Sequence, residues 1–94
     1  MPRLIERNPE TMATDVDGET FLVRPDREDI HYLDAVATGI WRLLSEPMSE
    51  NDMSIVMRDA FPDVSPDVIE ADLKRALEEL MAAGHLRSRN EGAG

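Results

Sequence analysis

The chain has 94 residues, of which 41% are hydrophobic, and this length supports one domain with a single modest core. It contains no cysteine, which excludes disulfides, thiolate-bound metals and a thiol nucleophile, and favours a cytoplasmic location. The formal net charge of -10 disfavours binding to nucleic acid and to anionic membranes, because both carry dense negative charge.

The N-terminal residues 1–10 mix apolar residues with prolines and alternating charges and show no sustained hydrophobic period. We therefore expect them to form a flexible N-terminal arm. They also lack the apolar run of a signal peptide, and no stretch of the chain approaches the roughly 20 apolar residues of a membrane span. The folded domain is expected over residues 11–89, and residues 90–94 are expected to form a loose C-terminal tail.

Three short strands are predicted in the first third of the chain. Residues 11–16 and 19–24 flank Asp17-Gly18, a dipeptide that readily adopts the positive φ angles of a tight hairpin. A polar turn over residues 25–29 leads to a third strand at residues 30–33, which is rich in β-branched and aromatic side chains. These segments predict a small antiparallel sheet.

The hydrophobic period changes from two residues to the helical 3.6 at Asp34, and three helices are predicted after it. Asp34, Ser49 and Ser65 are suitable N-cap residues for the three helices. The third helix is the longest and is expected to end at a glycine C-cap, Gly84, before a short extended piece at residues 85–88. Its apolar residues follow the spacing of one helical face: Ile69, Leu73, Ala76, Leu77 and Leu80. The predicted fold class is α+β, an N-terminal three-stranded antiparallel sheet followed by three helices.

The chain has no recognisable constellation for catalysis or metal binding. His31 and His85 are the only histidines, and neither has the partner spacing of a zinc motif. The serines lack a G-x-S-x-G elbow, and the glycines form neither a P-loop nor a dinucleotide fingerprint. Adjacent acidic residues are typical of a solvated surface. We therefore expect a protein that binds a partner, without enzyme activity, metal or cofactor.

Several short motifs run in the order and spacing of a known family: Tyr32-Leu33-Asp34, the run from Thr38 to Leu44, Asp72-Leu73, Ala76-Leu77 and Gly84-His85-Leu86. On these residues, over about positions 12–88, the chain resembles the PqqD-like family. Members of that family are small winged helix-turn-helix proteins. They act as peptide chaperones, also called precursor-peptide recognition elements, in ribosomal peptide modification that includes pyrroloquinoline quinone biosynthesis. The resemblance implies the same fold and function here.

The resemblance also implies a site. A leader peptide would add as a further strand to the edge of the third predicted strand, in a groove whose other wall is the third helix. Strand alternation puts Ile30 and Tyr32 on one face and His31 and Leu33 on the other, and the pair that points away from the core is the sharper candidate. The candidate peptide-binding residues are Asp29, Ile30, His31, Tyr32 and Leu33 on the strand and Ile69, Leu73, Ala76 and Leu77 on the helix.

The partners implied by the resemblance are a precursor peptide and a modifying enzyme such as a radical SAM protein. Other interpretations stay open at this point. The leucines of the third helix would be needed as core whether or not a peptide binds. A winged-helix DNA-binding regulator is disfavoured, because the N-terminal residues of the third helix, which would face the bases, are Ser65, Asp67 and Glu70. An adaptor for another protein, and a homodimer paired through the strand edge, are further alternatives.

Overall fold

The structure is a computed structural model that describes residues 3–90. Within these residues it has six strands and three helices: β1 (Arg3–Arg7), β2 (Met12–Val16), β3 (Glu19–Val23), β4 (Ile30–Leu33), α1 (Ala35–Leu43), β5 (Met48–Ser49), α2 (Glu50–Ala60), α3 (Pro66–Ala82) and β6 (Leu86–Asn90). The strands form two antiparallel sheets, in the orders β2-β3-β4 and β5-β1-β6. The predicted α+β class, with a three-stranded sheet followed by three helices, is confirmed. No helix in the described part of the chain is long and apolar enough to cross a membrane.

The β2-β3-β4 sheet is built around the predicted hairpin. Asp17 and Gly18 have φ angles of 53° and 82°, so both adopt the left-handed conformation that a two-residue hairpin turn requires. Strand β3 pairs with β2 on one side and with β4 on the other. Strand β4 therefore lies at an edge of this sheet.

All three predicted N-caps are present. The carboxylate Oδ1 of Asp34 accepts a hydrogen bond from the backbone N–H of Ala37 at 2.8 Å, at the start of α1. Ser49 and Ser65 accept in the same way at the starts of α2 and α3. Because Asp34 directly follows β4, the cap turns the chain from strand to helix within one residue.

Helix α3 ends at the predicted glycine. The N–H of Gly84 donates to the carbonyl of Met81, and the N–H of His85 donates to the carbonyl of Leu80, which is the hydrogen-bond pattern of a Schellman motif. Gly84 has a φ of 82°, a left-handed backbone conformation that residues with a Cβ rarely adopt. The turn into β6 therefore depends on glycine for its backbone conformation.

The second sheet contradicts the expectation of a flexible N-terminal arm. Strand β1 is the central strand of this sheet and pairs along its whole length with β6, while Ile5 is only 1% exposed. Glu6 forms ion pairs with Arg87 at 2.7 Å and with Arg89 at 3.3 Å across the same pair of strands. The extended piece predicted after α3 is thus a full strand that includes Asn90. The remainder of the expected tail, residues 91–94, lies outside the described residues.

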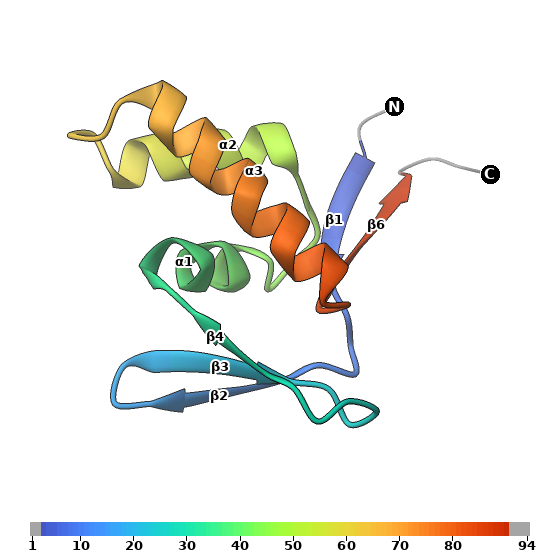
Figure 1. Cartoon of the computed structure of the whole chain (residues 1–94). Helices are drawn as coiled ribbons and strands as arrows, with labels where there is room; N and C mark the ends of the chain where they lie inside the picture. Colours follow the sequence, from blue (N-terminus) through green and yellow to red (C-terminus); the bar gives the residue numbers. More distant parts are fainter. Residues whose placement is uncertain (1–2, 91–94) are drawn as a thin grey trace.

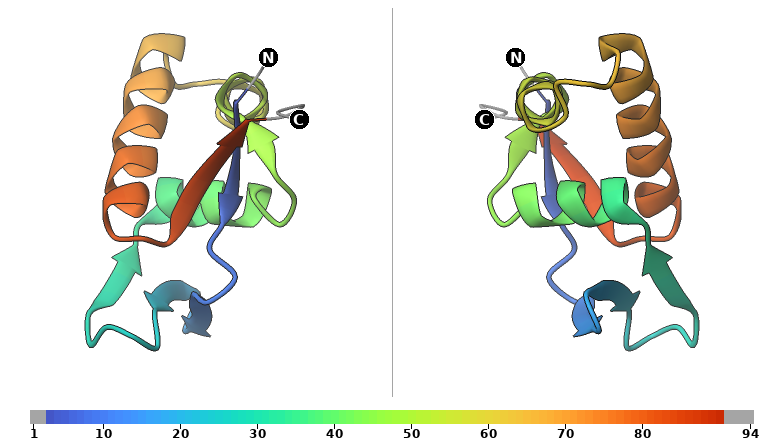
Figure 2. Two further views of the ribbon diagram at one scale, coloured as in Figure 1. Left: turned by 90° about the vertical axis from the view of Figure 1, so that its right-hand side faces the viewer. Right: turned by 90° about the vertical axis from the view of Figure 1, so that its left-hand side faces the viewer.

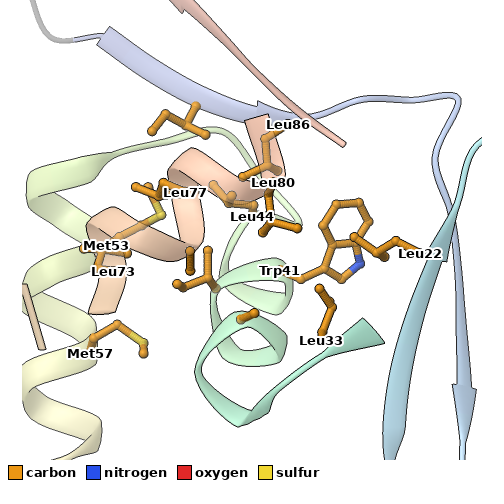
Figure 3. Close-up of a cluster of buried hydrophobic side chains, with 14 of the residues drawn as sticks. Leu22, Leu33, Trp41, Leu44, Met53, Met57, Leu73, Leu77, Leu80 and Leu86 are labelled. Carbon is orange, nitrogen blue, oxygen red and sulfur yellow. The ribbon is translucent and has the colours of Figure 1, made fainter. Parts of the chain in front are cut away.

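One hydrophobic core joins the elements. Helix α1 lies between the β2-β3-β4 sheet and the helices α2 and α3 (Figures 1 and 2). Its Trp41 side chain lies beside Leu22 of β3 and Leu33 of β4 (Figure 3). Leu73, Leu77 and Leu80 of α3 fill the other side of this core. The same residues thus hold the edge strand in place and fix the position of α3.

A substitution in β1 tests whether this segment is a structural strand. Replacing Ile5 with alanine should lower the free energy of unfolding by about 2–5 kcal/mol, because it removes a fully buried side chain and leaves a cavity. The measurement is urea denaturation followed by circular dichroism. Ile55→Ala is the matched control, since Ile55 is 47% exposed on α2 and its loss should change stability by no more than about 0.5 kcal/mol. Equal effects of the two substitutions would contradict a structural role for β1.

Candidate functional site

The free edge of β4 is the feature on which a binding site can be built. Among the described residues, β4 pairs only with β3, so its second edge carries backbone N–H and C=O groups without a strand partner. Strand β2 also has a free edge, but all five of its residues are exposed. Beside β4, in contrast, lie α1 and the C-terminal end of α3. Of the two edge strands of the β2-β3-β4 sheet, β4 is therefore the one whose free edge lies next to helices in the described part of the chain.

The side chains of β4 alternate between two faces. Leu33 is buried and His31 is half-buried, and both point to the side of the core. Ile30 and Tyr32 point away from the core and are 68% and 52% exposed. The sequence had left open which pair points outward, and the structure assigns it to Ile30 and Tyr32.

The start of β4 meets the end of α3. Arg27, in the turn before β4, donates a hydrogen bond to the carbonyl of Ala83 at 3.1 Å. The rings of His31 and His85 meet edge to face, with centroids 5.5 Å apart. His85 is buried, and its Nδ1 lies 3.0 Å from the hydroxyl oxygen of Thr11. These contacts fix one end of the strand against the helix, and Figure 2 shows β4 and α3 on the same side of the molecule.

An apolar pocket lies beyond the other end of β4. It has a volume of about 200 Å³ and is lined by residues of α1, α2, α3 and the turn between α2 and α3: Val36, Met57, Phe61, Val64, Ile69 and Asp72. Val36 follows the last residue of β4 by three positions. The pocket therefore adjoins the start of α1, the helix that directly follows β4.

The candidate residues of the sequence fall into two groups. Asp29 and the four residues of β4 lie together along the free edge. On α3, Ile69 lines the pocket, whereas Leu73, Ala76 and Leu77 are buried within the core. Met57, Phe61 and Val64 also line the pocket and were not among the residues predicted from the sequence. The signal available for Phe61 and Val64 was two large apolar residues in a short turn next to Pro62.

Charge at the candidate site is mostly negative. Glu28 and Asp29 are exposed just before β4, and Asp34 is exposed just after it. Asp72, at the pocket, pairs with Arg75 at 3.0 Å. No group of three or more side chains suited to hold a metal ion occurs among residues 3–90. One free strand edge, an apolar pocket and flanking carboxylates suit the binding of an extended peptide.

The pKa of His85 predicts a pH dependence of stability. Burial lowers this pKa below its ordinary value of 6.5, and the nearby charges of His31, Arg24 and Arg27 lower it further. The neutral ring therefore favours the folded state, and this contribution is complete above about pH 6.5 and is lost as the pH falls through the folded-state pKa. The free energy of unfolding should therefore decrease as the pH is lowered below about 6.5. Urea denaturation at several pH values measures this decrease in the free energy of unfolding.

The control for this prediction is His85→Asn, which keeps a polar group near Thr11 but does not titrate. The variant should be less stable than the wild type at neutral pH and should show a smaller decrease over the same pH range. An unchanged pH dependence in the variant would mean that other groups cause it.

Comparisons with known proteins agree with this geometry. Residues 19–86 match the model of the PqqD family, described as coenzyme PQQ synthesis protein D. No curated protein matched the sequence. The fold is similar to a solved structure described as TbiB1 in complex with the TbiA(beta) leader peptide, with a TM-score of 0.75 and 24% identity, over 95% of this chain and 98% of that chain. Because the family match covers most of the sequence, the chain belongs to the PqqD family.

Proposed function

We propose that this protein binds the leader segment of a ribosomally made precursor peptide by strand addition to β4 and presents it to a modifying enzyme. The observation that carries the proposal is the free edge of β4 with helical walls beside it, in a chain of the PqqD family. The similar structure is itself described as a complex with a leader peptide. The role is one of binding, and the chemistry would belong to the partner enzyme, such as a radical SAM protein.

The backbone of the leader would pair with β4 and so set the register of the leader on the strand. An added strand forms backbone hydrogen bonds with an edge strand irrespective of its sequence, so this part of the site gives affinity with little selectivity. Five residues would take part on the protein side, Asp29 to Leu33. Their backbone is held in the extended conformation by the pairing with β3 and by the contact between His31 and His85.

The apolar pocket would supply selectivity. A volume of about 200 Å³ is enough for one large aliphatic or aromatic side chain, and five of its six lining residues are apolar. Of the candidate residues on α3, Ile69 lines the pocket itself. In this proposal Leu73, Ala76 and Leu77 act indirectly, because as core residues they hold α3 at its distance from β4.

The negative charge of the protein would favour association with basic partners. A net charge of -10 and exposed carboxylates at both ends of β4 favour a leader or an enzyme surface that carries lysine and arginine. The proposal locates this encounter in the cytoplasm, because a precursor peptide is available there as soon as it leaves the ribosome.

The experiment that tests the proposal is selection of binders from a random library of linear peptides displayed with their encoding RNA. The immobilised full chain should enrich peptides, and hydrogen exchange on the complex should show new protection of backbone amides in β4. Failure to enrich any peptide, or protection confined to other elements, would refute it. Sedimentation at the working concentration serves as a control, since a homodimer paired through β4 would occupy the same edge.

N-methylation of a selected peptide gives a sharper prediction. A methyl group on a backbone nitrogen that faces β4 removes a hydrogen bond and blocks approach, so it should weaken binding by about tenfold or more. Methylation of the next nitrogen, which faces away, should have little effect. Titration calorimetry along the peptide should therefore give a response with a period of two residues. A response without this period would contradict strand addition.

The pocket is tested by Phe61→Ser. Phe61 is 39% exposed and lines the pocket, so its loss should weaken the binding of a selected peptide by about tenfold, the equivalent of about 1.4 kcal/mol of lost apolar contact. Ile55→Ser is the matched control on α2, because Ile55 is also exposed but does not line the pocket. Equal affinities of the two variants would remove the pocket from the site.

A further inference from the structure

The outward face of the β2-β3-β4 sheet carries two rows of side chains that end at the free edge. In the register of the sheet, Met12, Val23 and Ile30 form one row across the three strands. Thr14, Phe21 and Tyr32 form the next. Most of these side chains are apolar, and large exposed ones such as Ile30 and Tyr32 are unusual in a patch that nothing covers.

The ring of Tyr32 is held by its neighbour. The ring centroids of Tyr32 and Phe21 are 5.5 Å apart and the ring planes are tilted by 55°, which is a favourable arrangement for two aromatic side chains. Phe21 covers one side of Tyr32, and the other side faces the position that an added strand would take. Ile30 likewise has Val23 on one side only. Each row therefore ends at the free edge of β4, with no further strand on the far side of Ile30 or Tyr32 among the described residues.

We infer that the bound leader extends both rows. Its bound segment carries aromatic or β-branched residues opposite Ile30 and Tyr32, on the face turned away from the helices. The inference rests on the proposed function. Residues directly opposite one another in antiparallel strands share a face, with Cβ atoms about 4.5–5.5 Å apart. Ile30 and Tyr32 are therefore specificity-determining residues, and the preferred leader is apolar on both faces of its bound strand, one toward the pocket and one along these rows.

A second copy of the chain is a less suitable occupant of this face. Exposed carboxylates flank the two rows on both sides, on Asp17 and Glu19 at the hairpin and on Glu28 and Asp29 before β4. Stacking two copies would bring these like charges together, whereas a leader strand of neutral or basic residues would not.

The register of a bound peptide can be found by cross-linking, because the chain has no cysteine of its own. Peptides obtained from the random library are synthesised with one cysteine at each position in turn and are mixed with the Tyr32→Cys variant under mild oxidation. A disulfide should form at a single peptide position, and this position is the one opposite Tyr32. Peptides that bind without any preferred cross-link would refute strand addition at β4.

A thermodynamic cycle then tests the inference itself. Replacing the peptide residue opposite Tyr32 with alanine should weaken binding to the wild type by up to about fivefold. Against Tyr32→Thr the same change should have less than about a twofold effect, because the contact has already been removed. The same cycle applies to Ile30→Thr and the peptide residue opposite it.

The matched control is Val16→Thr, on the same face of the sheet but on the far strand β2, which should behave as the wild type does. Enrichment of polar residues opposite Ile30 and Tyr32, or equal effects of the peptide change on the wild type and on Tyr32→Thr, would overturn the inference and leave the proposed function standing. A library that yields no binder at all would instead remove the proposed function.

Discussion

The stacking of Arg7 on Trp41 is the contact on which the relation between the two sheets depends. The guanidinium carbon of Arg7, in β1, lies 4.4 Å from the centre of the indole ring of Trp41, in α1, and Arg7 also donates two hydrogen bonds to the carbonyl of Trp41. Burial lowers the pKa of Arg7, but a guanidinium stays protonated in proteins, so the cation–π contact persists. Since Trp41 also packs beside Leu22 and Leu33, one side chain links β1, α1 and the edge strand.

An edge strand held in this way can stay unpaired without promoting aggregation through its free edge. Strand β4 has only four residues, with acidic residues immediately before and after it. Short edges flanked by charge resist indiscriminate pairing with other chains. Because Asp34 caps α1 directly after the strand, the edge cannot lengthen. The strand is therefore available to a partner that fits between the strand and the helices, and poorly available to one that does not.

The sequence predicts the structure correctly where neighbouring residues determine it. The hairpin at Asp17-Gly18, the cap at Asp34 and the glycine turn at Gly84 are local signals, and all are present. Strand β1 was missed because its stability comes from pairing with β6, more than 80 positions away at Arg3 and Asn90, which no local pattern reveals. The period of α3 predicted its buried face, but a helical period cannot tell which neighbour covers that face. The pocket likewise draws on several elements, so its lining became visible only with their packing.

The geometry of α3 relates the two ends of the proposed site. Near its C-terminal end the helix contacts the turn before β4 through Ala83, and near its N-terminal end it contributes Ile69 to the pocket. Fourteen positions of helix span about 21 Å at 1.5 Å per residue. An extended chain covers the same length with six or seven residues. In the proposed complex a leader segment of about this size would engage both ends at once. Since α3 is one uninterrupted helix, the spacing between backbone pairing and the pocket is fixed before any peptide binds, and little ordering of the protein has to accompany binding.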